Sequence, residues 1–224
     1  MSLVGRIVAA SIVGVVFLFA FDASAAPIVW NSGPGHNNHS YEVIQTSTPI
    51  TWDEAQAAAI LAGGYLATTL SAEENAFVFA LADFSAYWAQ ETPTSSAHLG
   101  PWLGGYQLAG SAEPGGGWTW VNGDGPFSFT MWAGGEPSNG AGGPHGLTES
   151  RVHYFAYGGR GSTWNDFPET FTGGTPGYTF AGPIAYVVEY DRAVAPEPAI
   201  VLLLGSGVIA RMLASRRRPI EGRN

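Results

Sequence analysis

The chain ends in an apolar run bounded by prolines and arginines, and this order leaves few structural options. Pro196 and Pro198 cannot lie inside a helix, so a helix can begin only near Pro198, where a proline in the first turn is tolerated. At roughly 1.5 Å per residue, residues 199–215 would span about 26 Å, close to the roughly 30 Å hydrocarbon core of a membrane. Arginines at 216–218 favour the cytoplasmic side for the end that follows. We therefore expect a transmembrane helix over 199–215 and a basic cytoplasmic tail over 216–224; the alternative, a buried core helix, rarely ends in three arginines.

The opposite end has the three parts of a secretory signal peptide. Arg6 supplies a positive charge, residues 7–21 are apolar and uncharged, and Ala23-Ser24-Ala25 has the small residues of a cleavage site. We expect a signal peptide over 1–25 that is cut after Ala25, with an uncleaved anchor as the alternative. Both ends therefore predict that the protein works outside the cytoplasm.

The segment between these ends is strongly acidic and contains no cysteine. Between Pro27 and Ala195 there are fifteen acidic residues and three arginines, and the chain has no lysine. Nucleic acid and anionic membrane surfaces are therefore poor partners, whereas divalent cations are suitable ones. Without disulfides, an exported domain of this size must be held together by its hydrophobic core.

Two helix starts precede a series of strand segments. Thr51 with Glu54, and Ser71 with Glu74, have the spacing of capping boxes, and small or aromatic apolar residues follow each pair. Segments rich in aromatic and β-branched residues and bounded by turn formers predict strands; these are residues 65–70, 102–107, 117–121, 151–157 and 184–190. Two helices followed by strands and long loops indicate an α+β domain.

A series of short motifs, each weak alone, occurs in an order that resembles the C-type lectin family. The motifs are Trp52-Asp53-Glu54-Ala55, Gly63-Gly64-Tyr65-Leu66-Ala67, Ser71 with Glu74-Asn75 and Phe77, Trp102-Leu103-Gly104-Gly105, Trp118-Thr119-Trp120, Trp132 with Gly135-Glu136-Pro137, Trp164-Asn165-Asp166 and Tyr186-Val187-Val188-Glu189. The resemblance implies two helices packed on short antiparallel sheets with a long loop region, in a domain over 48–191. Residues 26–47 then form an N-terminal segment leading into the domain, and 192–198 form a linker.

The tail resembles the PEP-CTERM sorting signal of Gram-negative bacteria, which accompanies exopolysaccharide and biofilm production. The residues that carry this resemblance are Pro196, Glu197 and Pro198 before the apolar run and Arg216, Arg217 and Arg218 after it. It implies an exosortase-type processing enzyme as a partner. The protein would then be anchored in the cell envelope by its C-terminal helix, or released to the cell surface or matrix after processing.

The chain departs from the lectin family at its cysteines. Ala59 and Val188 stand where the resemblance places one disulfide, and we expect the same contact to be held by packing. Arg151 occupies one position of the second usual pair, and the sequence does not identify its partner. The long loop between Trp102 and Trp164 therefore lacks a disulfide, and a bound cation could order it.

The resemblance also implies a calcium site that grips sugar hydroxyls. Ca²⁺ prefers carboxylate and amide oxygens, and the expected ligands are Glu136, Ser138, Asn139, Glu149, Asn165 and Asp166. The same residues except Ser138, namely Glu136, Asn139, Glu149, Asn165 and Asp166, are expected to bind carbohydrate. Pro137 is a candidate cis proline. The alternative is that Glu136-Pro137 is a surface turn and that Trp164-Asn165-Asp166 is a turn with a core tryptophan.

The other candidate residues give weaker evidence for a functional site than the expected calcium ligands do. His36 and His39 could bind metal but lie in a polar segment, and His145 and His153 lack the spacing of a zinc site. Neither a nucleophile elbow nor a phosphate-binding glycine loop is present, so we expect no enzyme. Two hypotheses remain: calcium-dependent binding of carbohydrate, such as exopolysaccharide, or a metal-independent structural or adhesive module for protein, matrix or ice.

Overall fold

The computed structural model describes residues 26–140, 148–169 and 182–191. The expected signal peptide, the linker after Asp191, the 199–215 helix and the arginines of the tail lie outside these ranges. Within them, no helix is both long enough and apolar enough to span a bilayer. The elements are β1 (Ile28–Val29), β2 (Ser40–Gln45), α1 (Trp52–Leu61), β3 (Tyr65–Leu66), α2 (Ala72–Ala82), the 3₁₀ helix η1 (Ser85–Tyr87), β4 (Ala89–Gln90), β5 (Ala97–Gln107), β6 (Trp118–Trp120), β7 (Arg151–Tyr157), β8 (Thr163–Phe167) and β9 (Ala185–Tyr190).

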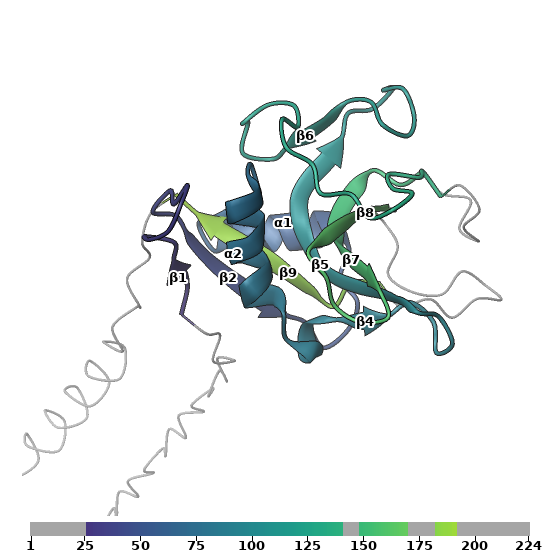
Figure 1. Cartoon of the computed structure of the whole chain (residues 1–224), viewed down its shortest axis with the longest axis horizontal. Coiled ribbons are helices and arrows are strands. Elements are labelled where there is room, and N and C mark those ends of the chain that lie inside the picture. Colours follow the sequence, from purple (N-terminus) through teal and green to yellow (C-terminus); the bar gives the residue numbers. More distant parts are fainter. Residues whose placement is uncertain (1–25, 141–147, 170–181, 192–224) are drawn as a thin grey trace, which may run out of the picture.

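The strands form one mixed sheet in the order β1-β2-β9-β5-β7-β8, with β3 on β9 and with β4 and β6 on β5 (Figure 1). The expected α+β class is confirmed, but the sheet is mixed rather than a set of short antiparallel sheets, because β5 pairs in parallel with β9 through Trp102 and Tyr186. The β5 strand also begins earlier than expected and continues through Pro101. Register shifts between β5 and β7 on both sides of Trp102 accommodate this proline, which cannot donate a ladder hydrogen bond.

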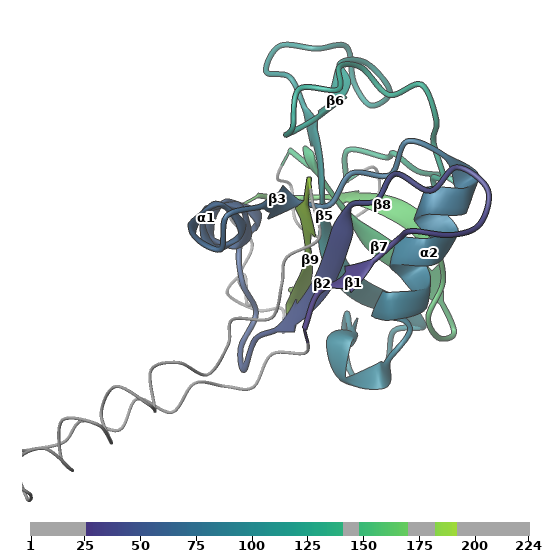
Figure 2. The same cartoon turned by 90° about the vertical axis from the view of Figure 1, so that its left-hand side faces the viewer.

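The two helices lie on opposite sides of the sheet, as Figure 2 shows. Thr51 and Glu54 form the complete capping box that the sequence predicts at α1. At α2 only half of the box is present: Ser71 accepts a hydrogen bond from the Glu74 amide, while the Glu74 carboxylate accepts one from Leu70 N at 2.7 Å. Glu74 is buried, and its carboxylate takes part in a polar network under the helix.

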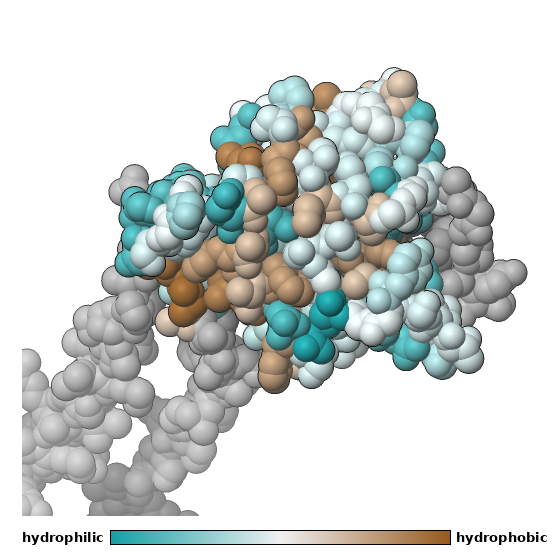
Figure 3. All heavy atoms as spheres, viewed as in Figure 1, coloured by the Kyte–Doolittle hydropathy of each residue, from teal (hydrophilic) through white to brown (hydrophobic). Residues whose placement is uncertain are grey.

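Each helix covers its own hydrophobic cluster. The α1 cluster includes Trp52, Ala59, Trp102 and Val188, and the α2 cluster includes Trp30, Val78, Trp118, Trp120 and Trp164. Ala59 and Val188 are both fully buried within the α1 cluster, so packing holds α1 against β9 as expected. The space-filling view in Figure 3 shows apolar surface over α2 and near β1.

Residues 26–47 contribute two strands to the sheet. Every residue of β2 pairs with β9, from Ser40 opposite Tyr190 to Gln45 opposite Ala185. Tyr41 on β2 is fully buried and stacks edge-on against Phe77 of α2. This N-terminal segment is therefore an integral part of the sheet.

Candidate functional site

Three carboxylates from distant parts of the chain gather around residues 138–140. The Asp166 carboxylate of β8 accepts hydrogen bonds from Ser138 N at 2.9 and 3.1 Å and from Asn139 N at 2.7 Å. Glu149, just before β7, accepts one from Gly140 N at 2.6 Å, and its own amide donates to Asn139 Oδ1 at 3.0 Å. Glu136 completes the group. We call Glu136, Glu149 and Asp166 the carboxylate cluster.

Local backbone geometry turns the chain around this cluster. The peptide bond between Glu136 and Pro137 is cis, as the resemblance implied. Gly135 and Asn139 adopt positive φ angles of 96° and 49°, and glycine and asparagine are the residues that most readily do so. The amides of residues 138–140 consequently point at the carboxylates.

Burial raises the pKa of all three carboxyl groups. The pKa of Glu149 rises to about 8, first because of burial and then because of the neighbouring charges of Asp166 and Glu136. The pKa of Glu136 rises to about 7, again chiefly through burial, although Ser138 opposes the shift by hydrogen bonding. Burial also raises the pKa of Asp166, against the lowering effect of the Ser138 and Asn139 amides. Three crowded carboxyl groups resist ionising together, and a cation would remove this repulsion.

The oxygen atoms of the carboxylate cluster are donors that a hard cation prefers. Glu136 Oε2 is buried without a hydrogen-bond partner, which leaves one acceptor that a cation could satisfy. The side chains that line the cluster offer oxygen rather than sulfur or imidazole, which suits Ca²⁺ rather than zinc. However, among the described residues no three acidic or histidine side chains are arranged as a formed metal-binding group. The residues therefore fit Ca²⁺ by the chemistry of their donor atoms.

Of the six predicted ligands, the structure brings five together and gives the side chain of Asn165 other partners. Cross-strand pairing aligns Asn165 with His153 on β7, so their side chains share one face of the sheet while Asp166 faces the other. Asn165 Nδ2 contacts His153 Nε2 at 3.3 Å and donates to the Asp166 carbonyl oxygen at 2.6 Å. His153 was not predicted to contact Asn165, because only the pairing register between β7 and β8 shows this neighbour.

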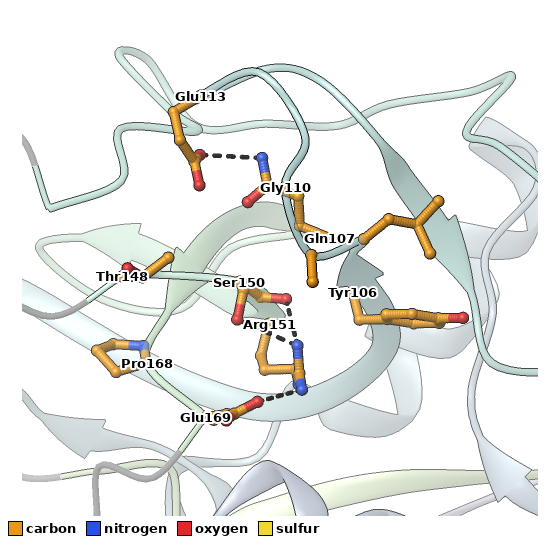
Figure 4. A pocket seen from close by; sticks show the side chains of 11 residues that line it. Tyr106, Gln107, Gly110, Glu113, Thr148, Ser150, Arg151, Pro168 and Glu169 are labelled. Atoms are coloured by element: carbon orange, nitrogen blue, oxygen red, sulfur yellow. Dashed lines mark hydrogen bonds and ion pairs between the residues drawn. The ribbon is translucent and has the colours of Figure 1, made fainter.

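Arg151 joins its own strand to the segment after β8, as Figure 4 shows, and also contacts α1. Its guanidinium forms an ion pair with Glu169, donates to Ser150 O at 3.1 Å and lies 4.7 Å from the centre of the Trp52 ring. Asp53 Oδ1 lies 3.9 Å away. At a position where the resemblance places a cysteine, an ion pair therefore joins β7 to the segment after β8.

A cavity of about 660 Å³ lies against Arg151. Tyr106, Gln107 and Glu113 line it together with Ser150, and Gln107 Nε2 donates to Glu113 at 3.0 Å (Figure 4). The guanidinium charge in this wall is already opposed by Glu169. The cavity therefore has a mixed polar and apolar lining, and the charge of Arg151 in its wall is used in an ion pair within the fold.

His39 belongs to a separate buried polar network. Its Nδ1 lies 2.6 Å from Glu189 Oε1, and Tyr41 Oη donates to Glu74 at 2.7 Å and to Glu189 at 3.2 Å. The hydrogen bond to Glu189 raises the pKa of His39, with burial acting in the opposite direction. His36 Nδ1 contacts the Gly33 carbonyl oxygen at 2.9 Å. The histidines of this segment are thus used within the fold.

The sequence matches no family model, and no curated protein matches it. The structure is similar to solved C-type lectin domains. One is the mouse scavenger receptor C-type lectin carbohydrate-recognition domain, 16% identical, covering 71% of this chain and 93% of that one with a TM-score of 0.45. Another is the cow carbohydrate-recognition domain of CD23 in the presence of an oligosaccharide, 18% identical, covering 77% and 99% with a TM-score of 0.46. A third is a calcium-independent type II antifreeze protein, 19% identical, covering 77% and 98% with a TM-score of 0.45.

Proposed function

We propose that this protein is a non-enzymatic C-type lectin-like binding module that binds Ca²⁺ at the carboxylate cluster and carbohydrate through that ion. The convergence of Glu136, Glu149 and Asp166 carries the proposal, together with the unpaired Glu136 Oε2. The ordered motifs of the sequence support the same family, since they occupy the helices, β5, β6, β8 and β9 of an α+β domain.

In this proposal the chain supplies charge and shape, and the ion supplies a centre to which sugar hydroxyls can coordinate. Ca²⁺ takes about six to eight oxygen ligands, more than the cluster alone offers. The Glu136 and Glu149 carboxylates would bind the ion and also accept hydrogen bonds from the sugar. The Asp166 carboxylate would bind it while the Ser138 and Asn139 amides keep this group in place.

A thermal-shift experiment tests the cation. A ligand that binds only the folded state raises its stability by mass action, so Tm should rise with added CaCl₂ and return to its starting value with EDTA. Asp166→Ala combined with Glu136→Ala should abolish the rise. Glu73→Gln, which removes an exposed carboxylate from the first turn of α2, should keep it. Absence of any shift at millimolar Ca²⁺ would contradict the cation site.

A metal-independent adhesive or structural module is the second candidate, and one observation favours it. Asp166 and Glu149 already accept backbone hydrogen bonds from residues 138–140, so the loop is held without an ion. Glycan-array binding measured with and without EDTA separates the two candidates. Binding that persists in EDTA favours this second function, and binding that EDTA removes favours the first.

We also propose that the protein is exported and sorted at the cell envelope, with exopolysaccharide as the carbohydrate partner. The support is in the sequence: the signal-peptide pattern over 1–25 and the Pro196-Glu197-Pro198 motif before an apolar run and three arginines. Fractionation of cells that express an epitope-tagged full chain tests this. Replacing Pro196, Glu197 and Pro198 with alanine should leave the protein unprocessed in the membrane, and an unchanged distribution would argue against sorting.

A further inference from the structure

The outer side of α2 is apolar along the middle of the helix. Residues 76–82 are seven consecutive apolar positions, so the outer side lacks polar groups as the inner side does. Ala76 and Ala80 are exposed there, 58% of Phe84 just beyond the helix is exposed, and Figure 3 shows apolar surface over α2. A helix that is apolar on all sides is normally covered on all sides. Because these residues are exposed, no segment within the described ranges covers this face.

The other helix has a different outer side. Asp53 and Glu54 are exposed in the first turn of α1 and suit solvent. The exposed apolar residues Ile60 and Leu61 stand together only at its C-terminal end. Single exposed apolar residues are common on monomers, whereas a continuous apolar patch marks an interaction site. Of the two described α-helices, α2 therefore has the face that calls for a partner.

The charge of the domain selects the kind of partner. The segment between the two ends of the chain contains fifteen acidic residues and three arginines. Two of these arginines, Arg151 and Arg160, already form ion pairs within the fold. Two copies of such a domain repel each other wherever their acidic surfaces meet. The middle of α2 carries no charge, so two copies can meet there without this repulsion, while a basic partner would be drawn to acidic surface instead.

The two ends of the α2 face carry charges that complement each other. Glu73 is exposed at the N-terminal end, and Arg160 pairs with Asp83 at the C-terminal end, with 2.5 Å between Nε and Oδ1. Ten residues separate Glu73 from Asp83, which is about 15 Å along a helix. If two α2 helices pack antiparallel, Glu73 of each copy comes near Arg160 of the other, whereas parallel packing brings two glutamates together. The charges at the ends therefore favour antiparallel packing and set its register.

We infer that the outer face of α2 is an interface for a second copy of this chain, formed by two antiparallel α2 helices about a two-fold axis. A two-fold interface uses the same patch on both copies, which the self-complementary charges at its ends allow. Ala76 and Ala80 lie at its centre, where small side chains let two helices approach closely, and Phe84 lies at its border. The dimer would hold two carboxylate clusters, which adds affinity for a repetitive polysaccharide only if the proposed function is correct. The interface itself does not depend on that function.

Cysteine cross-linking tests the interface in the full chain. The chain has no cysteine, so Ala80→Cys places a single thiol at the centre of the face. Treating cells that express this variant with an oxidant should give a dimer band on a gel, which a reductant removes. Ala57→Cys is the matched control, because Ala57 is also an exposed helical alanine but lies on α1, on the other side of the sheet. It should stay monomeric, and equal dimer yields from the two variants would overturn the inference.

A charge placed in the face should separate the two copies. Ala80→Glu sets two carboxylates against each other across the two-fold axis, and like charges that meet in an interface oppose association. In sedimentation equilibrium of the purified full chain in a mild detergent, Ala80→Glu should raise the dimer Kd by more than about tenfold. Ala57→Glu adds the same charge elsewhere and should change the Kd by less than about twofold. Glutamate is a good helix former, so both variants should fold, as circular dichroism can check.

Three outcomes would contradict a second copy as the partner. A chain that stays monomeric at every concentration, and whose Ala80→Cys variant gives no cross-link, would show that the copies do not associate. A dimer that Ala80→Glu leaves unchanged would place the interface elsewhere. A monomer that binds phosphatidylcholine vesicles, and loses this binding in Ala80→Glu, would show that the face docks on lipid. None of these measurements uses Ca²⁺ or carbohydrate, so they decide the interface separately from the proposed function.

Discussion

Replacing Arg151 with methionine removes the charge that joins β7 to α1 and to the segment after β8, while keeping much of the apolar stem. The side chain of Arg151 is 15% exposed and that of its partner Glu169 is 41% exposed. Removing one member of a buried pair costs about 3 to 5 kcal/mol, and the partly exposed Glu169 reduces this figure. The ring of Trp52 also loses its cation, worth about 0.5 to 2 kcal/mol.

We therefore expect Arg151→Met to lower the free energy of unfolding by about 2 to 4 kcal/mol. For a domain of this size, that corresponds to a fall in Tm of roughly 4 to 16 °C. Urea unfolding followed by tryptophan fluorescence measures the difference, since several tryptophans lie in the two cores. If the free energy of unfolding falls with urea concentration at the same slope in both proteins, the surface exposed on unfolding is the same in both.

Arg160 provides a matched control. It pairs with Asp83, but their side chains are 36% and 45% exposed, so Arg160→Met should cost only about 0 to 1 kcal/mol. If the two variants lose the same stability, the Arg151 ion pair does not hold these segments together, and the reasoning from burial is refuted. Glu169→Gln should lower stability in the same direction as Arg151→Met and by a smaller amount.

Three further predictions concern pH and capping. Because the folded-state pKa of Glu149 is raised to about 8, the cation-free protein should lose stability as pH rises from about 4.5 to 8. Urea unfolding measured across this range in the presence of EDTA should show the loss, and Glu149→Gln should make the stability depend less on pH. The pKa of His39 is raised by its hydrogen bond to Glu189, so this pairing stabilises the fold below about pH 6.5 and is lost as pH rises through the raised value. The protection of the β2 amides, corrected for the intrinsic pH dependence of exchange, should therefore fall as pH rises, and His39→Gln should remove this fall. Thr51→Ala should cost about 1 kcal/mol by removing the capping box of α1, and an unchanged urea midpoint would contradict that estimate.

The elements that could be predicted from the sequence are those governed by local rules. The spacing of Thr51 and Glu54 identifies the start of α1, and the run of aromatic and β-branched residues identifies both ends of β7. The strand β8 was missed because Trp164-Asn165-Asp166 also has the composition of a turn. The early start of β5 was missed because Pro101 normally excludes a strand interior, and the compensating register shifts arise only from pairing with β7.

In the candidate site, too, the sequence predicts some features and the tertiary structure adds the others. The resemblance to the lectin family selects Glu136, Glu149 and Asp166 as candidate ligands, and their role in calcium binding stays a prediction. Their shared environment, and the raised pKa values that result, depend on burial and on neighbours distant in sequence.

By itself, the sequence determined the α+β class, the helix starts and the acidic character of the domain, since these follow from local propensity and composition, whereas the residues of the cluster were expected only from the resemblance to a family. Only the tertiary structure decided that Glu169 pairs with Arg151 and that Asn165 turns toward His153. The physical reason is that hydrogen bonds and ion pairs act over a few ångströms. Cross-strand register, which the local sequence does not specify, selects which side chains come within that distance.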